Sequence, residues 1–519
     1  MKLKKILLVL LVCLIGNTAI SQQTNDDVVV TLIFTNDMES AYEPVPAWWR
    51  DDINRIGGIA ELTTLIKNVR RDEPNVFLFD SGDIFTGALS RITEGALMFE
   101  FMITMDYDAM AIGNHEFDYE EKVFEWRKNH APFPVLSANI FYKDTDHPFA
   151  QRHTVIERNG VRIGVIGILG QDAGTTAVGP YSTDELDIID EAEALQKSVD
   201  ELRDDVDLIV ALTHMGHTAP MQTDAEADPR LDRDIDKDIA LADAVEGVDV
   251  LFGGHADAGT WDPVVSPVNG TLIMQTFGQA TYLGFLQLTL DSSNRTIKAY
   301  DGKLVTVDSD QLEPDADIVA KMAAYRAKYP ELTEVVGHTA ERLNRRYFDE
   351  SDLGNLLADI AVEMSGADIG LIHGGTIRKD IPKGSVEVAD ILDTNPFIDP
   401  IVVIEMSGEK LFGVMEQSFT LLRGLLQVSG LEVVYDTSRP ERERLVSLRH
   451  KGVDIKADDV ITVALPAIIA GGADHFDDFR SARLIRETKP LGELTIEYFR
   501  KHREIPVPTS GRQRDLAAE

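Results

Sequence analysis

Residues 109–118 read AMAIGNHEFD, a short apolar run that stops at a glycine and continues with polar side chains. A brief apolar run bounded by polar residues is typical of a strand that is buried on both faces. The polar continuation brings Asn114, His115 and Asp118 to the end of that strand. Because ligands of open α/β sheets bind beyond the carboxyl ends of the strands, this stretch predicts a buried strand that ends at a binding site.

The same design recurs along the first half of the chain. Further apolar runs of strand length end at Phe34, Asp80, Leu169, His214 and His255. Between the first two lies GIAELTTLIKNVRR, whose apolar spacing is typical of an amphipathic helix. Buried strands that alternate with helices predict a layered α/β fold.

Residues of the types that bind metals follow these runs. They are Asp37, Glu39, Asp83, Asn114, His214, His255 and Asp257. Side chains i and i+2 of an extended chain point the same way, so we expect Asp37 and Glu39 to aim at one spot. Glycines that would let the backbone turn sharply beside these residues stand at positions 82, 113, 216, 253 and 254. Carboxylate, amide and imidazole groups gathered at one edge suit a pair of divalent cations bridged by one carboxylate.

The length of the chain, 519 residues, exceeds what one hydrophobic core usually serves and indicates two large domains. We expect the first at residues 26–312 and the second at 335–515, joined by a linker helix within 313–334. The boundary rests on the polar, proline-containing stretch VDSDQLEPDA, which is followed by the amphipathic pattern of residues 317–332. The second half again mixes the patterns of helices and strands, so an α/β domain is expected there too.

Residues 1–21 have the composition of a secretory signal peptide. Three lysines among the first five residues precede the apolar run ILLVLLVCLIG (6–16), and small residues suited to cleavage follow at 19–21. A membrane helix is the alternative, but this run is shorter than the ~20 residues that span a bilayer. Cys13, the one cysteine of the chain, lies in this segment, so the exported protein would contain no disulfide. We expect a periplasmic or secreted protein without a membrane span after cleavage.

The formal net charge is −38, and removal of the three leader lysines would make it −41. Nucleic-acid polymers and anionic membrane surfaces are poor partners for such a chain because like charges repel. A solvated acidic surface accounts for most of the excess and identifies no ligand. The expected partner is therefore a small molecule, and the sequence leaves the oligomeric state undetermined.

The ordered motifs resemble the calcineurin-like metallophosphoesterases, and among them the exported 5'-nucleotidases and 2',3'-cyclic phosphodiesterases. The matching motifs of the first half surround Asp37, Asp83, the stretch GNHEFD, His214 and His255. Those of the second half are LGNLLAD (353–359), GGTIRKDIPKG (374–384) and AGGADHF (470–476). The resemblance covers nearly the whole chain beyond the leader. It implies a four-layer α/β/β/α sandwich followed by an α/β domain of the 5'-nucleotidase C-terminal type.

The resemblance also implies two divalent ions that are bridged by Asp83. Asn114, His214 and His255 complete the site of one ion, and Asp37 belongs to the site of the other. Imidazole ligands suit Zn, Fe or Mn.

Two positions depart from the family pattern: Glu39 stands where the family has His, and Asp257 stands where it has Gln or Asn. If both bind, the site of Asp37 contains oxygen ligands alone, which favours Mn, Mg or Ca over Zn. We therefore expect a mixed pair of ions. The alternative is that Glu39 or Asp257 only hydrogen-bonds to the groups that bind the metal.

In the same family His115 lies over the phosphate and Asp118 holds its ring, so the resemblance assigns them a catalytic role. The pair would stabilise charge on the phosphoryl group in the transition state. A metal-bound hydroxide would attack phosphorus in line while the alcohol leaves on the opposite side. The expected activity is the hydrolysis of phosphate monoesters.

The second domain is expected to select the substrate. Arg378 in the GG-x-I-R motif should approach the phosphate, with Arg346 or its neighbour Arg345 as a second contributor, unless Arg378 forms only a surface ion pair. The family holds a nucleobase between two aromatic rings, but the matching positions in this chain carry Val428 and Ala467.

Rings that would replace this pair are Phe397, Phe476, Trp48 and Trp49. His373 stands where the family has Asn, and Asp474 is displaced by one position from the acid that reads the ribose. Because stacking contributes a few kcal/mol to the binding of a base, we expect relaxed or non-nucleotide specificity.

Three alternatives remain open at this stage. A 2',3'-cyclic nucleotide or other phosphodiesterase would use the same metal pair on a diester. A relative of the thiosulfohydrolases would cleave a sulfur ester. A protein of another class, exported and non-catalytic, would only bind metal or ligand, although His115 and Asp118 argue against it.

Overall fold

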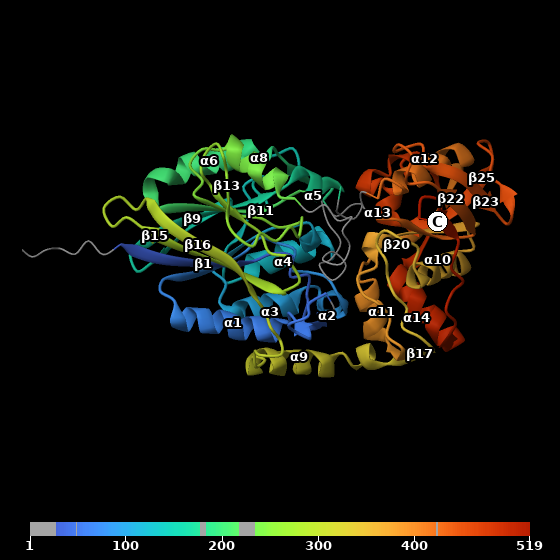
Figure 1. The fold of residues 1–519 in the computed structure, drawn as a ribbon, viewed down its shortest axis with the longest axis horizontal. Coiled ribbons are helices and arrows are strands. Elements are labelled where there is room, and N and C mark those ends of the chain that lie inside the picture. The colour runs from blue at the N-terminus through green and yellow to red at the C-terminus, as the bar shows by residue number, and fades with distance from the viewer. Residues whose placement is uncertain (1–26, 48, 177–182, 217–233, 422–423, 519) are drawn as a thin grey trace, which may run out of the picture.

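The computed structural model describes residues 27–47, 49–176, 183–216, 234–421 and 424–518. The expected signal peptide and the candidate ring Trp48 lie outside these ranges. The chain forms one lobe from its first half and a second lobe from its last third, drawn from blue to yellow and from orange to red in Figure 1. Among the described residues, every helix is too short or too polar to cross a membrane.

Two six-stranded sheets form the centre of the first lobe. In spatial order the first sheet consists of β16 (Ile297–Thr306), β15 (Tyr282–Leu290), β1 (Val28–Thr35), β4 (Val76–Asp80), β5 (Ala109–Ala111) and β6 (Val135–Leu136). The second consists of β13 (Val264–Val265), β14 (Leu272–Met274), β12 (Val250–Phe252), β11 (Leu208–His214), β9 (Val161–Leu169) and β8 (His153–Arg158). Two-stranded ribbons join β2 (Val45–Pro46) to β3 (Arg55–Ile56) and β7 (Ile140–Tyr142) to β10 (Leu186–Ile188).

Helices cover the outer face of each sheet (Figure 1). On the side of the first sheet lie α1 (Ile59–Asp72), α2 (Ala88–Thr93), α3 (Ala96–Met105), α4 (Glu121–His130) and α9 (Ala316–Lys328). On the side of the second lie α6 (Glu191–Leu202) and α8 (Asp236–Ala244), while the short α5 (Gln171–Thr176) follows β9.

The order of the layers follows from the alternation of side chains along β1. Ile33 packs with the helices, whereas Leu32 and Phe34 point into the space between the two sheets. There the ring of Phe34 stacks on Phe252 of β12, with 4.0 Å between the ring centroids. This arrangement confirms the predicted four-layer α/β/β/α sandwich.

The apolar runs of the first half all form strands, but they divide between the sheets. β1, β4 and β5 lie in the first sheet, and β9, β11 and β12 lie in the second. Neighbours within each set are parallel, so three carboxyl ends point to one edge of each sheet. The site therefore draws its loops from two sheets, which the order of motifs alone did not indicate.

The amphipathic pattern expected at residues 317–332 forms a shorter helix. Helix α9 begins after Asp315, whose side chain accepts the N–H of Asp317, and it ends at Lys328. Pro330 then starts a single 3-10 turn, since a proline disfavours helical backbone in the residue before it. In Figure 1 this helix runs below the first lobe toward the second.

The second lobe is built on a five-stranded sheet. Its strands in spatial order are β21 (Leu426–Ser429), β18 (Ile369–His373), β25 (Val460–Pro466), β20 (Pro400–Ser407) and β26 (Arg483–Pro490). Its helices are α10 (Asp352–Ser365), α11 (Val388–Thr394), α12 (Gly408–Ser418), α13 (Ala467–Ala470) and α14 (Leu491–His502). Smaller sheets pair β19 (Gly384–Glu387), β17 (Val335–Thr339) and β27 (Glu504–Ile505), and β24 (Val453–Asp454), β23 (Leu445–His450), β22 (Leu431–Tyr435) and β28 (Gln513–Asp515).

The two lobes share buried apolar surface. In β20, Val403 faces α10 and α14, while Val402 faces α12 on the other side of the sheet. The apolar cluster on the first of these faces continues through α11 into α2 and α3 of the first lobe. The second lobe is therefore packed against the first, which brings its loops to the edge where the metal-ligand residues lie.

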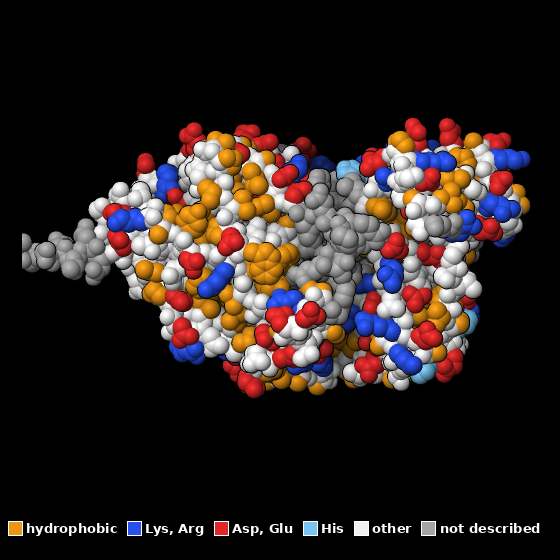
Figure 2. All heavy atoms as spheres, viewed as in Figure 1, with side chains coloured by type: hydrophobic (Ala, Val, Ile, Leu, Met, Phe, Trp, Pro, Cys, Tyr) orange, Lys and Arg blue, Asp and Glu red, His pale blue; other side chains and the backbone are white. Residues whose placement is uncertain are grey.

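Acidic side chains are not gathered in one place on the visible face of the molecule. On the face shown in Figure 2, Asp and Glu side chains are scattered over both lobes and alternate with Lys and Arg. This distribution agrees with a solvated acidic surface as the origin of the net charge.

Candidate active site

The carboxyl ends of three strands of the first sheet (β1, β4 and β5) and two of the second (β11 and β12) bring the candidate metal ligands together. In chain order these residues are Asp37, Glu39, Asp83, Asn114, His214, His255 and Asp257, and all of them are buried or nearly so. Asp83, His214 and His255 present possible ligand atoms that lie within 4.8 Å of one another. The two sheets thus contribute to one compact polar cluster.

Asp37 and Glu39 converge for a reason other than strand alternation. β1 ends at Thr35, and the φ angles of Asp37 and Glu39 are 47° and 43°, so the chain is not extended there. Their backbone N–H groups donate to the carbonyls of Gly82 and Asp83, at 2.9 Å in each case. Pairing with the loop after β4 therefore aims both carboxylates at the cluster, and the extended-chain argument for their convergence was wrong.

Left-handed backbone conformations are frequent among these residues. Five of the seven candidate ligands have positive φ: Asp37, Glu39, Asp83, His255 and Asp257. A non-glycine residue in this conformation costs about 1–3 kcal/mol and persists where its surroundings over-determine it, most often at functional sites. The concentration of such residues at one edge is a second, independent sign of function.

The cluster holds more buried negative than positive charge. One oxygen of Asp83 lies 3.0 Å from Nε2 of His214, and the other accepts the backbone N–H of His115 at 2.7 Å. Burial alone would raise the pKa of Asp83, but these histidines hold it below its ordinary value. Burial lowers the pKa of His214, yet Asp83 and Asp37 raise it to about 10. Burial raises the pKa of Asp37 to about 7, with Asp83 and Glu39 acting in the same direction and His214 against it.

The residues present fit divalent cations. Nδ1 of His214 lies 2.8 Å from the carbonyl of Ser81, a partner that orients its Nε2 toward Asp83. Oε2 of Glu39 is buried and has no hydrogen-bond partner among the described residues, a state that a bound cation would relieve. A Cβ at Gly254 would lie about 3 Å from His214, Asp37 and Ser81, so a larger residue there would displace these groups.

Several of the glycines are required because neighbouring groups lie very close to them, and not because the backbone turns sharply there. Gly82 and Gly216 have φ angles of 92° and 116°, as expected for sharp turns. Gly113, Gly253 and Gly254 do not have positive φ. A Cβ at Gly113 would lie 2.3 Å from Oδ1 of Asp83, so a larger residue would push the two loops apart.

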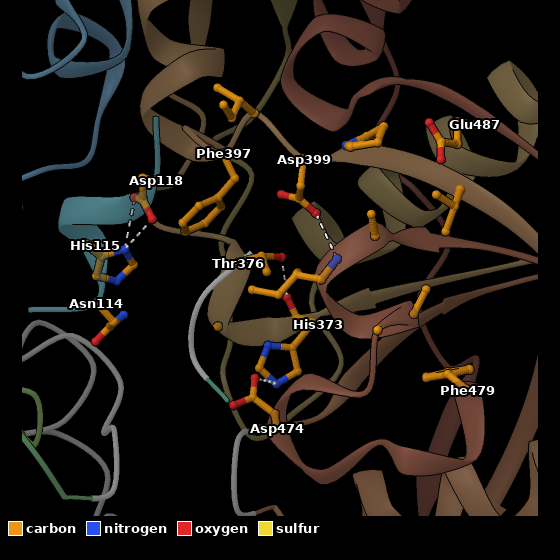
Figure 3. A pocket seen from close by; sticks show the side chains of 18 of the residues that line it. Asn114, His115, Asp118, His373, Thr376, Phe397, Asp399, Asp474, Phe479 and Glu487 are labelled. Atoms are coloured by element: carbon orange, nitrogen blue, oxygen red, sulfur yellow. Dashed lines mark hydrogen bonds and ion pairs between the residues drawn. The ribbon is translucent and has the colours of Figure 1, made fainter. Parts of the chain in front are cut away.

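His115 and Asp118 form a hydrogen-bonded pair beside the cluster (Figure 3). Nδ1 of His115 lies 3.0 and 3.1 Å from the two carboxylate oxygens of Asp118. Nε2 lies 2.8 Å from a guanidinium nitrogen of Arg378, which can only donate, so the neutral form of the ring would accept at Nε2 and carry its proton at Nδ1. Burial lowers the pKa of His115, but Asp118 and Asp83 raise it to about 9.

Arg378 reaches this pair from the second lobe. The same guanidinium nitrogen lies 2.7 Å from Oε1 of Glu39, and the arginine side chain is 17% exposed. Its backbone N–H donates to the carbonyl of Thr394 at 2.8 Å, which ties its loop to α11. Arg378 therefore lies at the metal-ligand cluster and does not form the surface ion pair that was the alternative.

A cavity of about 900 Å³ opens beside this contact and is lined from both lobes (Figure 3). The first lobe contributes Asn114, His115 and Asp118 to its wall. The second contributes Phe397, whose ring centroid lies 6.0 Å from that of His115 and 5.6 Å from the guanidinium carbon of Arg378. The cavity thus joins the metal-ligand cluster to a pocket in the second lobe.

Known families match both halves of the chain. The model of the calcineurin-like phosphoesterases matches residues 30–256, and that of the 5'-nucleotidase C-terminal domain matches residues 335–481. Human 5'-nucleotidase is 30% identical over an alignment that covers 93% of this chain and 90% of the human protein. The chain belongs to the 5'-nucleotidase family.

Other members of the 5'-nucleotidase family are similar along most of their length. The snake venom 5'-nucleotidase of Naja atra is 28% identical and aligns with 86% of this chain and 91% of its own. The crystal structure of the 5'-nucleotidase precursor of Thermus thermophilus is 27% identical, with a TM-score of 0.80 and coverage of 94% and 99% of the two chains. As a member of this family the chain is a metal-dependent phosphoric ester hydrolase, which confirms the predicted family, fold and enzyme class.

The predicted substrate-binding residues of the second lobe differ in their position relative to the cavity. Asp474 and Ala467 line the cavity, and Arg345 lines it too, whereas Arg346 is exposed and is not among the lining residues. Val428 is buried in the core of the second lobe and does not line the cavity, so the lack of a ring at this position says nothing about how a base is held.

Of the replacement rings, Phe397 lines the cavity. Phe476 is buried in the apolar core behind His373, and Trp49 packs at the core between the two sheets of the first lobe. Phe397 stands in the NPF turn directly before β20, and it stays a predicted substrate-binding residue.

Glu116, to which no role was assigned from the sequence, connects the loops of the site. Its fully buried carboxylate accepts the backbone N–H groups of Gly113, Asp83 and Ile84 at 2.5, 2.9 and 2.9 Å. The signal that was available is its position inside GNHEFD, between the catalytic candidate His115 and the core residue Phe117. Glu116 is thus a positioning residue for the loop that carries Asp83.

We expect Glu116→Gln to weaken the binding of Mn²⁺ about 10- to 100-fold, as is usual when a group that orients metal ligands is lost. A glutamine amide has one acceptor oxygen, and its NH₂ group would face a backbone N–H. Calorimetric titration with Mn²⁺ measures the change. Glu94→Gln removes an exposed carboxylate of the same lobe and should not alter the affinity. Equal affinity in Glu116→Gln and the native chain would contradict the positioning role.

Proposed function

We propose that this chain is an exported phosphohydrolase that cleaves phosphate monoesters, namely nucleotides or related small phosphoesters, at two divalent ions. The observation that carries the proposal is the contact of Arg378 with His115 and Glu39, directly beside the buried Asp83 and His214. A donor suited to phosphate and a set of metal-ligand residues therefore meet at one place. Export is supported by the composition of residues 1–21 and by the similarity to a nucleotidase named for its occurrence in venom.

The domain limits belong to this proposal. Residues 26–312 would form the dimetal domain, 313–334 the linker and 335–515 the substrate-binding domain. The two family matches, at 30–256 and 335–481, fall inside these limits.

Asp83 would bridge the two ions. Asn114, His214 and His255 would complete one site, and Asp37, Glu39 and Asp257 the other. Bound divalent ions would supply an acidified water and would neutralise the phosphoryl oxygens. The oxygen-only composition of the second set supports the expected mixed pair, in which that site prefers Mn, Mg or Ca over Zn.

Arg378 and His115 would bind the phosphoryl group. Their contact leaves Nε2 of His115 as an acceptor, with the ring held by Asp118. A phosphoryl oxygen that takes over the hydrogen bond of Arg378 frees Nε2 to carry a proton toward that oxygen. The carboxylates that raise the pKa of His115 favour this protonated ring, which stabilises the charge that develops during transfer.

The substrate range is tested by phosphate release from AMP and from ribose 5-phosphate, with the purified chain loaded with Mn²⁺. Phe397 offers a ring to one face of a base, and stacking on one ring contributes about 1–3 kcal/mol. We expect kcat/KM for AMP to exceed that for ribose 5-phosphate by about 100-fold at most. Release from neither compound would contradict the proposed monoester activity, and a much larger preference would show that further groups grip the base.

Phe397→Ala checks the contribution of this ring. We expect kcat/KM to fall about 10- to 100-fold for AMP and much less for ribose 5-phosphate, which has no base to stack. Phe476→Leu, a change of a buried ring outside the cavity lining, should affect both compounds equally if it affects them at all. Equal losses for the two compounds in Phe397→Ala would mean that the ring only supports Arg378.

A further inference from the structure

The wall of the cavity beyond Phe397 holds a carboxylate that the proposed phosphoryl chemistry does not use. Asp399 lines the cavity two positions after Phe397, and its side chain lies on the far side of that ring from His115 (Figure 3). One of its oxygens accepts the backbone N–H of Ile468 at 3.3 Å. Among the described residues, Asp399 takes part in no ion pair.

The surroundings of Asp399 make an unpaired carboxylate costly. The lining residues near it in sequence or bonded to it are Ile398, Pro400, Val402, Ala467 and Ile468, which offer it little besides backbone groups. Burial raises the pKa of Asp399 to about 6 despite these hydrogen bonds, and the carboxylate of Asp118 acts in the same direction. Arg91 interacts electrostatically with Asp399, but its guanidinium group pairs with Glu493. Near neutral pH the cavity wall therefore has a negatively charged acceptor without a direct ion-pair partner among the described residues.

The position of this acceptor is suited to the group that leaves with the alcohol. The phosphoryl group is expected at Arg378 and His115, and Phe397 lies between that place and Asp399 (Figure 3). A leaving group attached to the phosphate would pass along the ring of Phe397 and reach Asp399. The cavity volume of about 900 Å³ is large enough for a nucleoside.

We propose that Asp399 is a specificity-determining residue that accepts a hydrogen bond from an N–H group on the leaving group, while Phe397 packs against the apolar face of that group. The inference rests on the proposed phosphohydrolase function. The ligand class is a leaving group with an N–H donor, either a nucleobase or a small amino alcohol. A carboxylate favours an N–H donor because the hydrogen bond is charge-assisted, and a protonated amine would also interact with the ring.

Pairs of substrates that differ by one N–H group test this role. They are AMP and purine riboside 5'-phosphate, GMP and IMP, and phosphoethanolamine and ethyl phosphate. We expect the Mn²⁺-loaded native chain to favour the N–H member of at least one pair by about 10-fold or more in kcat/KM, because a site built for a donor rejects the analogue that lacks it. The pair that responds identifies the source of the donor.

Asp399→Asn should reduce that ratio about 10- to 100-fold. The amide of asparagine has one acceptor oxygen, which the N–H of Ile468 occupies, so its NH₂ group would face the donor of the ligand. Glu487→Gln is the matched control, since it removes one negative charge from an exposed position on the same cavity and should leave the ratio unchanged. Thermal unfolding of both variants reports whether they fold. If Asp399→Asn does not fold, Asp399→Ser replaces it in the same assays.

Two further readouts separate this inference from the proposed function. Hydrolysis of p-nitrophenyl phosphate reports the phosphohydrolase activity without any N–H group. Calorimetric binding of adenosine against purine riboside, guanosine against inosine and ethanolamine against ethanol repeats the comparison without turnover. Native ratios near one for all pairs in both assays, or equal ratios in the native chain and Asp399→Asn, would overturn the inference. Failure to hydrolyse p-nitrophenyl phosphate and all six phosphoesters would instead overturn the proposed function.

Discussion

Asp83→Asn should lower phosphate release from AMP by about 1,000-fold or more, because a loss of several kcal/mol of charge stabilisation has that effect on a rate. One carboxylate oxygen of Asp83 lies 3.0 Å from His214, and the other is oriented by the backbone N–H of His115. A bridging ligand must offer an anionic oxygen to each ion. Asparagine offers one neutral oxygen, so both proposed ion sites lose affinity together.

Metal content gives the second measurement for Asp83→Asn. After loading with Mn²⁺ and removal of excess metal, elemental analysis should find fewer than two ions per chain, whereas the native chain should hold two. Asp72→Asn, which changes an exposed carboxylate shortly before β4, is the control for a loss of one negative charge. Two tightly bound ions together with more than a tenth of the native rate would show that Asp83 does not bridge the metals.

The fold was predictable because its signals are local. Short apolar runs bounded by polar residues, such as the one that became β11, favour buried strands, and the helix pattern before β4 became α1. The division of these strands between two sheets was not predictable. It depends on which strands pair, and pairing joins segments far apart in the sequence, as between β1 and β15.

Site residues that belong to short ordered motifs were predictable from the sequence. The backbone conformation that orients them was not, because it depends on contacts between distant loops. Asp83, Asn114 and His214 stand in motifs, and the structure brings them together. The left-handed turn at Glu39 depends on backbone pairing with the loop of Asp83, which no local pattern reports.

The residues that line the cavity could not be predicted from short motifs either. The family's base-stacking position was matched to Val428, and the missing ring predicted relaxed specificity, but Val428 is buried in the core of the second lobe and does not line the cavity. Phe397 and Asp399 line the cavity because β20 begins there, and the turn before the strand faces the first lobe.

His115→Ala should lower phosphate release about 100- to 10,000-fold, the usual contribution of a positioned proton donor or acceptor. Metal binding should persist. The contact of Asp83 with residue 115 uses the backbone N–H, which alanine retains, and the imidazole of His115 is not among the proposed ligands. A parallel loss of metal would contradict the catalytic role and would make His115 part of the metal site.

Asp118→Asn completes this test, because Asp118 touches the ring of His115 and is expected to act through it. The variant should lose about 10- to 100-fold, since an asparagine can still accept from Nδ1 but no longer favours the protonated ring. Residues that act as a unit are not additive, so Asp118→Asn should cost almost nothing further in a chain that already carries His115→Ala. If the two losses multiplied in the double variant, Asp118 would contact the substrate or the metals directly, and the assignment of the proton to His115 would have to be shared between them.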